Sequence, residues 1–173
     1  TLARSMSDKD EGTERLVALL ERLGVNRWAA RSEADDAVVN ARNLVPMFLL
    51  LREVWKHVVR EGDTSWLQKD ARLLAQEPEA GWSDMRRALA SLQAKGATAQ
   101  ELTDVVKGKQ VSLLYDVFET LCDDDPDLEA EFSGIGWGVF ETDAVGRPGR
   151  RMDRLFAPVV TLDPTGRCMG PRE

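Results

Sequence analysis

The chain contains one histidine, His57, so every reaction that needs an imidazole must use this residue. Serine–histidine–aspartate triads, cysteine–histidine nucleophilic sites and metal sites built on several histidines all depend on that side chain. In helical register His57 lies between Glu53 and Glu61, with further charged residues beside it. This pattern is typical of a solvent-facing helix surface, so we expect no catalytic role for His57.

The best candidate for ligand chemistry is a cluster of four arginines within eight residues of the C-terminal segment. Guanidinium groups bind carboxylates and phosphates in a forked geometry, and the glycine and proline residues nearby favour a loop. With nearby carboxylates and a tryptophan they form a candidate interaction patch: Trp137, Glu141, Asp143, Arg147, Arg150, Arg151 and Arg154. The alternative, which the charge distribution favours, is that these arginines pair with acidic residues of their own chain.

Two other patterns resemble ligand-binding motifs but have the wrong spacing. The alternating acids from Asp123 to Glu131 imitate a calcium loop, but Leu128 and Gly134 occupy the positions that require glycine and glutamate. The glycines around Trp137 follow an acidic helical segment instead of a strand, so they do not make a nucleotide-binding loop. We therefore predict no catalytic residues, no metal and no cofactor.

The charge distribution limits the classes of molecule that we expect this protein to bind. The net charge of −7 divides unevenly, because residues 1–143 carry 17 basic and 27 acidic residues, whereas residues 144–173 carry 6 basic and 3 acidic residues. An acidic body repels phosphate, so a nucleic-acid partner is disfavoured, although the basic tail could reach one.

Cysteine content and apolar run length indicate a cytoplasmic protein. Cys122 and Cys168 form no C-x-x-C pair and suggest no disulfide framework, which fits a reducing compartment. The longest apolar run, residues 44–51, is far shorter than the roughly 20 residues that a membrane span needs. We expect no membrane partner, and the oligomeric state stays open.

Hydrophobic periodicity predicts a mainly α fold: a helical bundle of about five to seven helices with a small C-terminal β-hairpin or extended segment. The predicted helices cover about residues 13–23, 32–62, 64–76, 83–95 and 98–122. Pro46 interrupts the second of these, so we expect a kink or two helices, with a break near residues 43–45.

Local signals set the ends of these helices. The residues predicted to start them are Thr13, Ser32, Thr64, Ser83 and Thr98. Thr98 and Glu101 have the spacing of a full capping box, and Ser32 and Asp35 have similar spacing. Gly24 and Gly96 are placed to end helices in the left-handed conformation.

The helical period fails after Asp123, and the remaining residues predict a different structure. Asp125 is placed to cap a short helix. Residues 139–142 and 159–162 are predicted strands, residues 143–149 a loop, and residues 163–166 a turn. We therefore divide the chain into a frayed N-terminus (1–12), a helical bundle (13–132) and a hairpin or tail packed on the bundle (133–173).

The five tryptophans are many for a chain of this length, and lie at positions 28, 55, 66, 82 and 137. We expect all of them in the core or at its edge, with Trp28 as an anchor into the core. Any tryptophan that is instead exposed would suggest an interface.

These observations lead to three hypotheses about function. The first, which we favour, is a non-catalytic, acidic, cytoplasmic protein-interaction module that regulates, adapts or inhibits a partner protein. The second is a small enzyme that uses carboxylates and arginines at the junction of bundle and tail. The third is nucleic-acid binding through the loop from Arg147 to Arg154.

Overall fold

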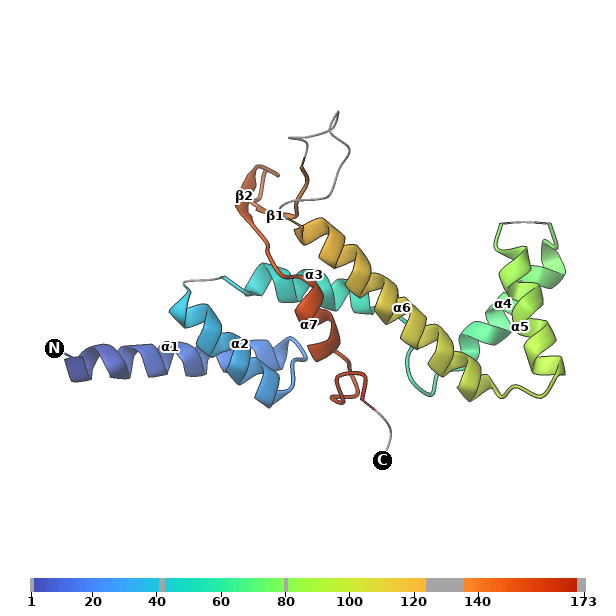
Figure 1. The fold of residues 1–173 in the computed structure, drawn as a ribbon, viewed down its shortest axis with the longest axis horizontal. Helices are drawn as coiled ribbons and strands as arrows, with labels where there is room; N and C mark the ends of the chain where they lie inside the picture. Colours follow the sequence, from blue (N-terminus) through green and yellow to red (C-terminus); the bar gives the residue numbers. More distant parts are fainter. Residues whose placement is uncertain (1, 41–42, 80, 124–135, 171–173) are drawn as a thin grey trace. The chain divides into compact units, whose positions relative to one another are not determined.

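The computed structural model describes residues 2–40, 43–79, 81–123 and 136–170. Within these ranges it contains seven helices and one two-stranded antiparallel sheet, which confirms the predicted mainly α fold with a C-terminal hairpin (Figure 1). The chain forms two compact units. The first comprises Thr1–His57 and Leu113–Glu173, and the second comprises Val58–Ser112.

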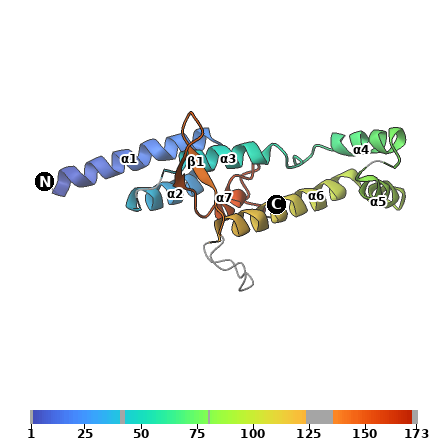
Figure 2. The same ribbon diagram turned by 90° about the horizontal axis from the view of Figure 1, so that it is seen from above.

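The first unit begins with two helices, α1 (Leu2–Arg22) and α2 (Arg27–Val39), which lie side by side in both ribbon views (Figures 1 and 2). Their contact buries a set of aliphatic side chains, which includes Val17, Leu20, Ala30, Ala34 and Ala37. Gly24 ends α1 with a φ of 100°, as predicted, because only glycine adopts that conformation without strain.

Both of these helices start earlier than the sequence indicated. α1 begins at Leu2, so Thr13 is a buried mid-helix residue and not a cap. Residues 2–12, within the predicted frayed end, are helical. α2 begins at Arg27, because the side chain of Asn26 accepts a hydrogen bond of 2.9 Å from the backbone N–H of Ala29. Asparagine is as good an N-cap as serine, so Asn26 caps the helix and Ser32 lies inside it.

Pro46 separates two helices. α2 ends at Val39 and α3 (Val45–Trp55) begins with Pro46 in its first turn, where a missing N–H costs nothing. The break therefore confirms the predicted position. α3 supplies much of the core of the first unit through Leu44 just before it, Met47, Phe48, Leu51 and Trp55.

The C-terminal segment folds onto α3. Residues 159–162 were predicted as a strand, but residues 159–161 belong to the short helix α7 (Phe156–Thr161) and Leu162 follows its end, so that prediction was wrong. Leu155 and Val159 are buried there, and the indole N–H of Trp55 donates a hydrogen bond of 2.8 Å to the carbonyl oxygen of Val159. Burial and this contact outweigh the modest helix penalty of a β-branched residue.

A β-hairpin precedes α7. β1 (Phe140–Thr142) is the strand expected at residues 139–142. It pairs with β2 (Pro148–Arg151), whose first two residues lie in the predicted loop 143–149. Gly146, with a φ of 82°, provides the tight turn between them. Pro148 opens β2, a strand position that tolerates proline. The short helix predicted to start at Asp125 lies outside the described residues.

The second unit consists of α4 (Ser65–Gln76), α5 (Ser83–Ala94) and the first part of α6 (Ala99–Cys122), which continues into the first unit. Its core cluster consists of Leu67, Leu89 and Leu102. The capping box at the start of α6 forms as predicted: Thr98 N–H donates to Glu101 (2.8 Å), and Glu101 N–H donates to the hydroxyl of Thr98 (3.2 Å).

The contrast between Trp55 and Trp28 gives a first prediction. Replacing Trp55 with phenylalanine removes its hydrogen bond to Val159 and leaves that buried carbonyl unsatisfied. We expect Trp55→Phe to lower the free energy of unfolding by about 1–3 kcal/mol, measured by urea denaturation. Trp28, which is 77% exposed, is the matched control, and Trp28→Phe should leave stability unchanged. An equal effect of both substitutions would contradict this account of Trp55.

Candidate functional site

The seven residues of the candidate interaction patch all lie in the first unit, but they do not act as one group. The structure separates them by what each side chain contacts. Asp143 and Arg147 close the hairpin turn, Trp137 and Arg151 contact the end of α6, and Glu141, Arg150 and Arg154 line two hollows. The site is therefore described in these three parts.

Asp143 and Arg147 hold the hairpin turn in shape. The guanidinium Nε of Arg147 donates to the Asp143 carboxylate at 2.7 Å, and the backbone N–H groups of Val145 and Arg147 donate to its other oxygen at 3.0 Å. These donors favour the ionised carboxylate, so the pKa of Asp143 lies below its usual range, chiefly through the backbone N–H of Arg147. Both charges serve the turn and are neutralised by each other.

Trp137 and Arg151 anchor the hairpin at the C-terminal end of α6. Helix C-termini expose carbonyl oxygens that have no intrahelical donor and carry partial negative charge. The guanidinium group of Arg151 reaches the carbonyl oxygens of Cys122 (3.4 Å) and Asp123 (3.3 Å). The indole N–H of Trp137 donates to the carbonyl oxygen of Thr120 at 2.6 Å. The arginine thus supplies the positive charge that this helix end favours.

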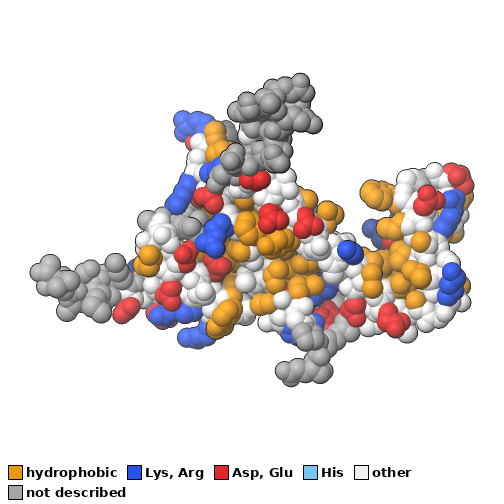
Figure 3. Space-filling model, viewed as in Figure 1, with side chains coloured by type: hydrophobic (Ala, Val, Ile, Leu, Met, Phe, Trp, Pro, Cys, Tyr) orange, Lys and Arg blue, Asp and Glu red, His pale blue; other side chains and the backbone are white. Residues whose placement is uncertain are grey.

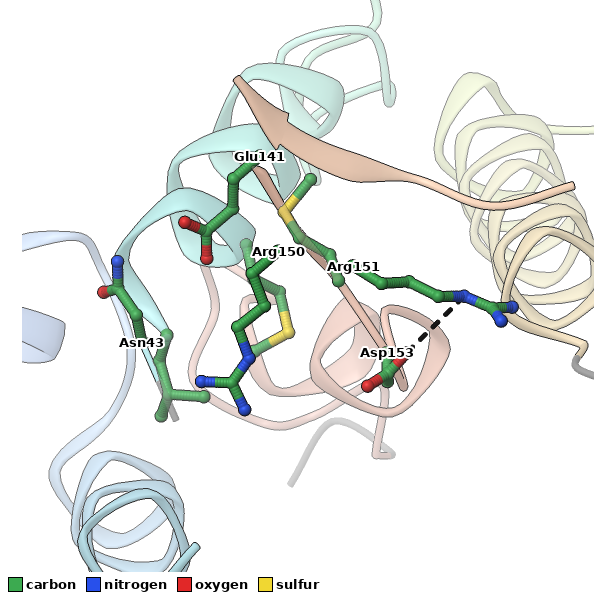
Figure 4. A pocket seen from close by; sticks show the side chains of 8 residues that line it. Asn43, Glu141, Arg150, Arg151 and Asp153 are labelled. Carbon is green, nitrogen blue, oxygen red and sulfur yellow. Dashed lines mark ion pairs between the residues drawn. The ribbon is translucent and has the colours of Figure 1, made fainter. Parts of the chain in front are cut away.

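A small hollow lies beside the strands of the hairpin (Figure 4). Glu141 and Arg150 extend into it from the two strands, whereas Arg151 points away towards α6 and Asp153. The remaining lining residues are Asn43, Leu44, Met47, Met152 and Asp153. Its volume of about 30 Å³ is suited to a water molecule, whereas small-molecule pockets measure about 300–1,000 Å³.

A second hollow of about 230 Å³ adjoins the first and shares three of its lining residues. It lies between α2 and the start of α7 and is lined by Ser32, Glu33, Asp36, Leu44, Met47, Asp153, Arg154, Ala157 and Pro158. Arg154 has a φ of 60°, a conformation that costs strain in any residue with a side chain. The lining is mixed in charge, and Asp143 belongs to neither hollow.

Two exposed apolar residues of the hairpin were missed by the sequence analysis. Phe140 is 46% exposed and Val145 is 76% exposed at the turn. The sequence analysis considered mainly the arginines and acidic residues of that segment. A strand of three residues is also too short to show the alternation of apolar and polar residues that distinguishes its two faces. Trp137 and Arg147 are also exposed residues of this segment.

The other residues weighed for chemistry have structural surroundings. His57 is exposed, and the sulfur of Cys122 accepts a hydrogen bond from the backbone N–H of Leu155 at 3.4 Å. Among the described residues, no group of three or more histidine, cysteine or acidic side chains is arranged to hold a metal ion. No helix within the described ranges is long and apolar enough to cross a membrane.

Comparison of the chain with protein-family models, with curated proteins and with solved structures found no match.

The opposite directions of Arg150 and Arg151 predict different effects on stability. Arg151→Ala removes the cationic donor from the end of α6, and we expect it to lower the free energy of unfolding by about 1–2 kcal/mol. Arg150 is the matched control because it is exposed and adjacent, and its alanine variant should change stability by less than about 0.5 kcal/mol. Chemical denaturation measures both, and equal losses would show that Arg151 has no special role.

The contacts of Asp143 in the hairpin turn predict that its pKa depends on Arg147. The folded pKa of Asp143 is depressed, so its stabilisation of the turn is present above the ordinary aspartate pKa and is lost as pH falls through the lower folded value. Carboxyl NMR should show Asp143 titrating below ordinary aspartate, and Arg147→Ala should raise its pKa. Arg150→Ala should leave that pKa unchanged, and a rise in both variants would point to a general charge effect instead.

Proposed function

We propose that this protein is a non-catalytic interaction module that binds a partner protein through the outer surface of its β-hairpin. That hairpin surface consists of Trp137, Phe140, Val145 and Arg147. The observation that carries the proposal is the exposure of three large apolar side chains within nine residues of a short, firmly attached segment. Isolated exposed apolar residues are ordinary, but a local group of them favours an interface.

The attachment of the hairpin supports this proposal. Arg151 and Trp137 fix its base to α6, and the contacts of Asp143 with Arg147 fix its turn. A two-stranded hairpin is only marginally stable alone, so these contacts supply the order that its own backbone pairing does not. A surface ordered in advance loses less conformational entropy on binding, which favours affinity.

The residue types of the hairpin surface also fit protein recognition. Tryptophan, phenylalanine and arginine are enriched in protein–protein interfaces, and tryptophan and arginine often carry much of the binding energy. Arg147 is largely exposed while it pairs with Asp143, so it presents a guanidinium face without an uncompensated charge. We further propose that this acidic protein, with a net charge of −7, is cytoplasmic, in keeping with its two free cysteines.

The two other hypotheses receive less support from the described residues. An enzyme at the junction of bundle and tail needs a pocket that brings Glu141, Asp143 and arginines together, but Asp143 lies outside the hollow that Glu141 lines. Nucleic-acid binding needs several arginines available to phosphate, but Arg147 contacts Asp143 and Arg151 contacts the end of α6. The contacts of these residues therefore support protein binding more than catalysis or nucleic-acid binding.

Site-specific cross-linking tests the proposal. A photo-activated phenylalanine analogue placed at position 140 in the native host should capture a discrete protein partner. The same analogue at Val39, which is 80% exposed on α2 of the same unit, serves as the matched control and should not capture it. With the captured protein purified, Phe140→Ala combined with Val145→Ala should weaken binding by about tenfold or more, as expected for interface anchors.

Three results would contradict the proposed function. Capture of the same proteins from positions 39 and 140 would show that the hairpin surface is not special. Binding that survives both alanine substitutions would place the interface elsewhere. Retardation of nucleic acid in a low-salt gel, lost with Arg147→Ala and Arg150→Ala, would favour the nucleic-acid hypothesis instead.

A further inference from the structure

The β-hairpin has an open edge along β1. The sheet contains two strands, so β1 pairs with β2 on one side and meets no strand on its other side within the described residues. The pairing extends just beyond the strands themselves. The carbonyl oxygen of Val139 accepts a hydrogen bond of 2.8 Å from the N–H of Met152. The N–H of Asp143 donates to the carbonyl oxygen of Arg147 at 3.1 Å, so the ladder spans residues 139–143.

This open edge presents backbone groups that have no partner. In an antiparallel pair, the backbone groups of successive residues point to opposite edges of their strand. Because those of Val139 and Asp143 point to the other strand, those of Phe140 and Thr142 point outwards. Both residues are exposed, and no described residue forms a hydrogen bond with their N–H or C=O groups. The open edge therefore offers donors and acceptors in the spacing that an added strand requires.

The two strands differ in their protection against such pairing. Proteins protect edge strands with proline, with bulges and with charged side chains. β2 has all three, because it begins with Pro148, has an extra residue between its two paired positions and contains Arg150 and Arg151. β1 contains neither a proline nor an extra residue, and its one charged side chain is Glu141. The hairpin therefore favours the addition of a strand at β1.

Glu141 indicates the charge of that strand. Its side chain extends towards the hollow beside the hairpin, on the opposite face of β1 from Phe140 and Thr142 (Figure 4). Among the described residues Glu141 forms no side-chain hydrogen bond or ion pair, although Arg150 lines the same hollow. A residue directly beside it in an added strand would have its Cβ atom about 4.5–5.5 Å away. A lysine or arginine there would neutralise the carboxylate.

The same carboxylate argues against a second copy of this chain as the source of the strand. If two copies of β1 pair antiparallel with Phe140 opposite Thr142, each Glu141 lies opposite the other Glu141. Moving the register towards the turn places Glu141 opposite Asp143, which is also acidic. Like charges directly opposite each other destabilise a sheet. The added strand is therefore expected from a protein of different sequence.

We propose that the partner protein adds a strand to the open edge of β1, and that this strand carries a lysine or arginine between two apolar residues. The inference rests on the proposed function, because it names the form in which the partner meets the hairpin. The apolar residues would lie on the face of Phe140, which is 46% exposed, and Figure 3 shows hydrophobic side chains at the surface of the hairpin. A third strand would also stabilise a hairpin that is marginal alone.

Selection of short random peptides displayed on phage, with the full chain as target, tests this inference. Enriched peptides should place a basic residue between apolar ones. Thr142→Pro should weaken the binding of a synthetic enriched peptide by about tenfold or more, because proline removes the outward N–H and obstructs the added strand. Thr142→Val is the matched control, since it keeps that N–H and should leave the affinity unchanged. Repeating the selection with Glu141→Gln should remove the preference for a basic residue.

Amide hydrogen exchange gives a second readout that needs no variant. In the free chain the amides of Phe140 and Thr142 should exchange rapidly, whereas the amide of Asp143 is bonded to Arg147 and should exchange more slowly. Saturation with the enriched peptide should slow exchange at Phe140 and Thr142 by about tenfold or more. This measurement decides the question if Thr142→Pro fails to fold, which circular dichroism would reveal.

Three results would overturn this inference. Enriched peptides that bind both Thr142 variants equally, without slowing exchange at positions 140 and 142, would show that they add no strand. If those peptides still need Phe140 and Val145, the proposed function stands and the strand addition alone fails. A selection that yields no peptide dependent on Thr142 would also exclude strand addition, while capture at position 140 would still decide the proposed function. Dimerisation of the chain that is lost with Thr142→Pro would make a second copy the occupant of the open edge.

Discussion

The carbonyl oxygens at the C-terminal end of a helix need hydrogen-bond donors, and in this protein that need determines how the C-terminal segment is held. α6 ends at Cys122, and its last carbonyl oxygens must find partners outside the helix. Arg151 and the indole of Trp137 provide them from the two ends of the hairpin segment. Because both donors come from that segment, the contact that completes the helix also positions the hairpin. The exposed side chains of the hairpin owe their fixed direction to this helix end.

Features that depend on neighbouring residues alone could be predicted from the sequence. Gly24 and Gly96 adopt the left-handed conformation that ends a helix, and Pro46 begins one, because each effect arises from the backbone of a single residue. The capping box of Thr98 and Glu101 forms because its two hydrogen bonds span only three residues. Such signals predict where helices end or begin without any knowledge of packing, and hydrophobic periodicity predicts that the fold is mainly helical.

Features that depend on distant residues could not be predicted in this way. Val159 favours a strand by itself, and Trp55, far away in sequence, helps to hold it in a helix. Arg150 and Arg151 are neighbours of identical type, yet the pairing of β2 with β1 directs them to opposite sides. The sequence therefore could not distinguish the arginines that hold the hairpin, Arg147 and Arg151, from the other two. It also could not show that Met85 of α5 faces solvent, since burial requires a partner surface.

The two units differ in net charge, so they differ in the long-range attraction that they offer to a charged partner. Residues 58–112, which form the second unit, carry eight basic and eight acidic residues and are neutral. The first unit carries the whole net charge, and acidic units repel one another at short range. The hairpin surface lies on this acidic unit, but residues 144–173 carry 6 basic and 3 acidic residues, so a partner meets a locally basic segment on an acidic unit.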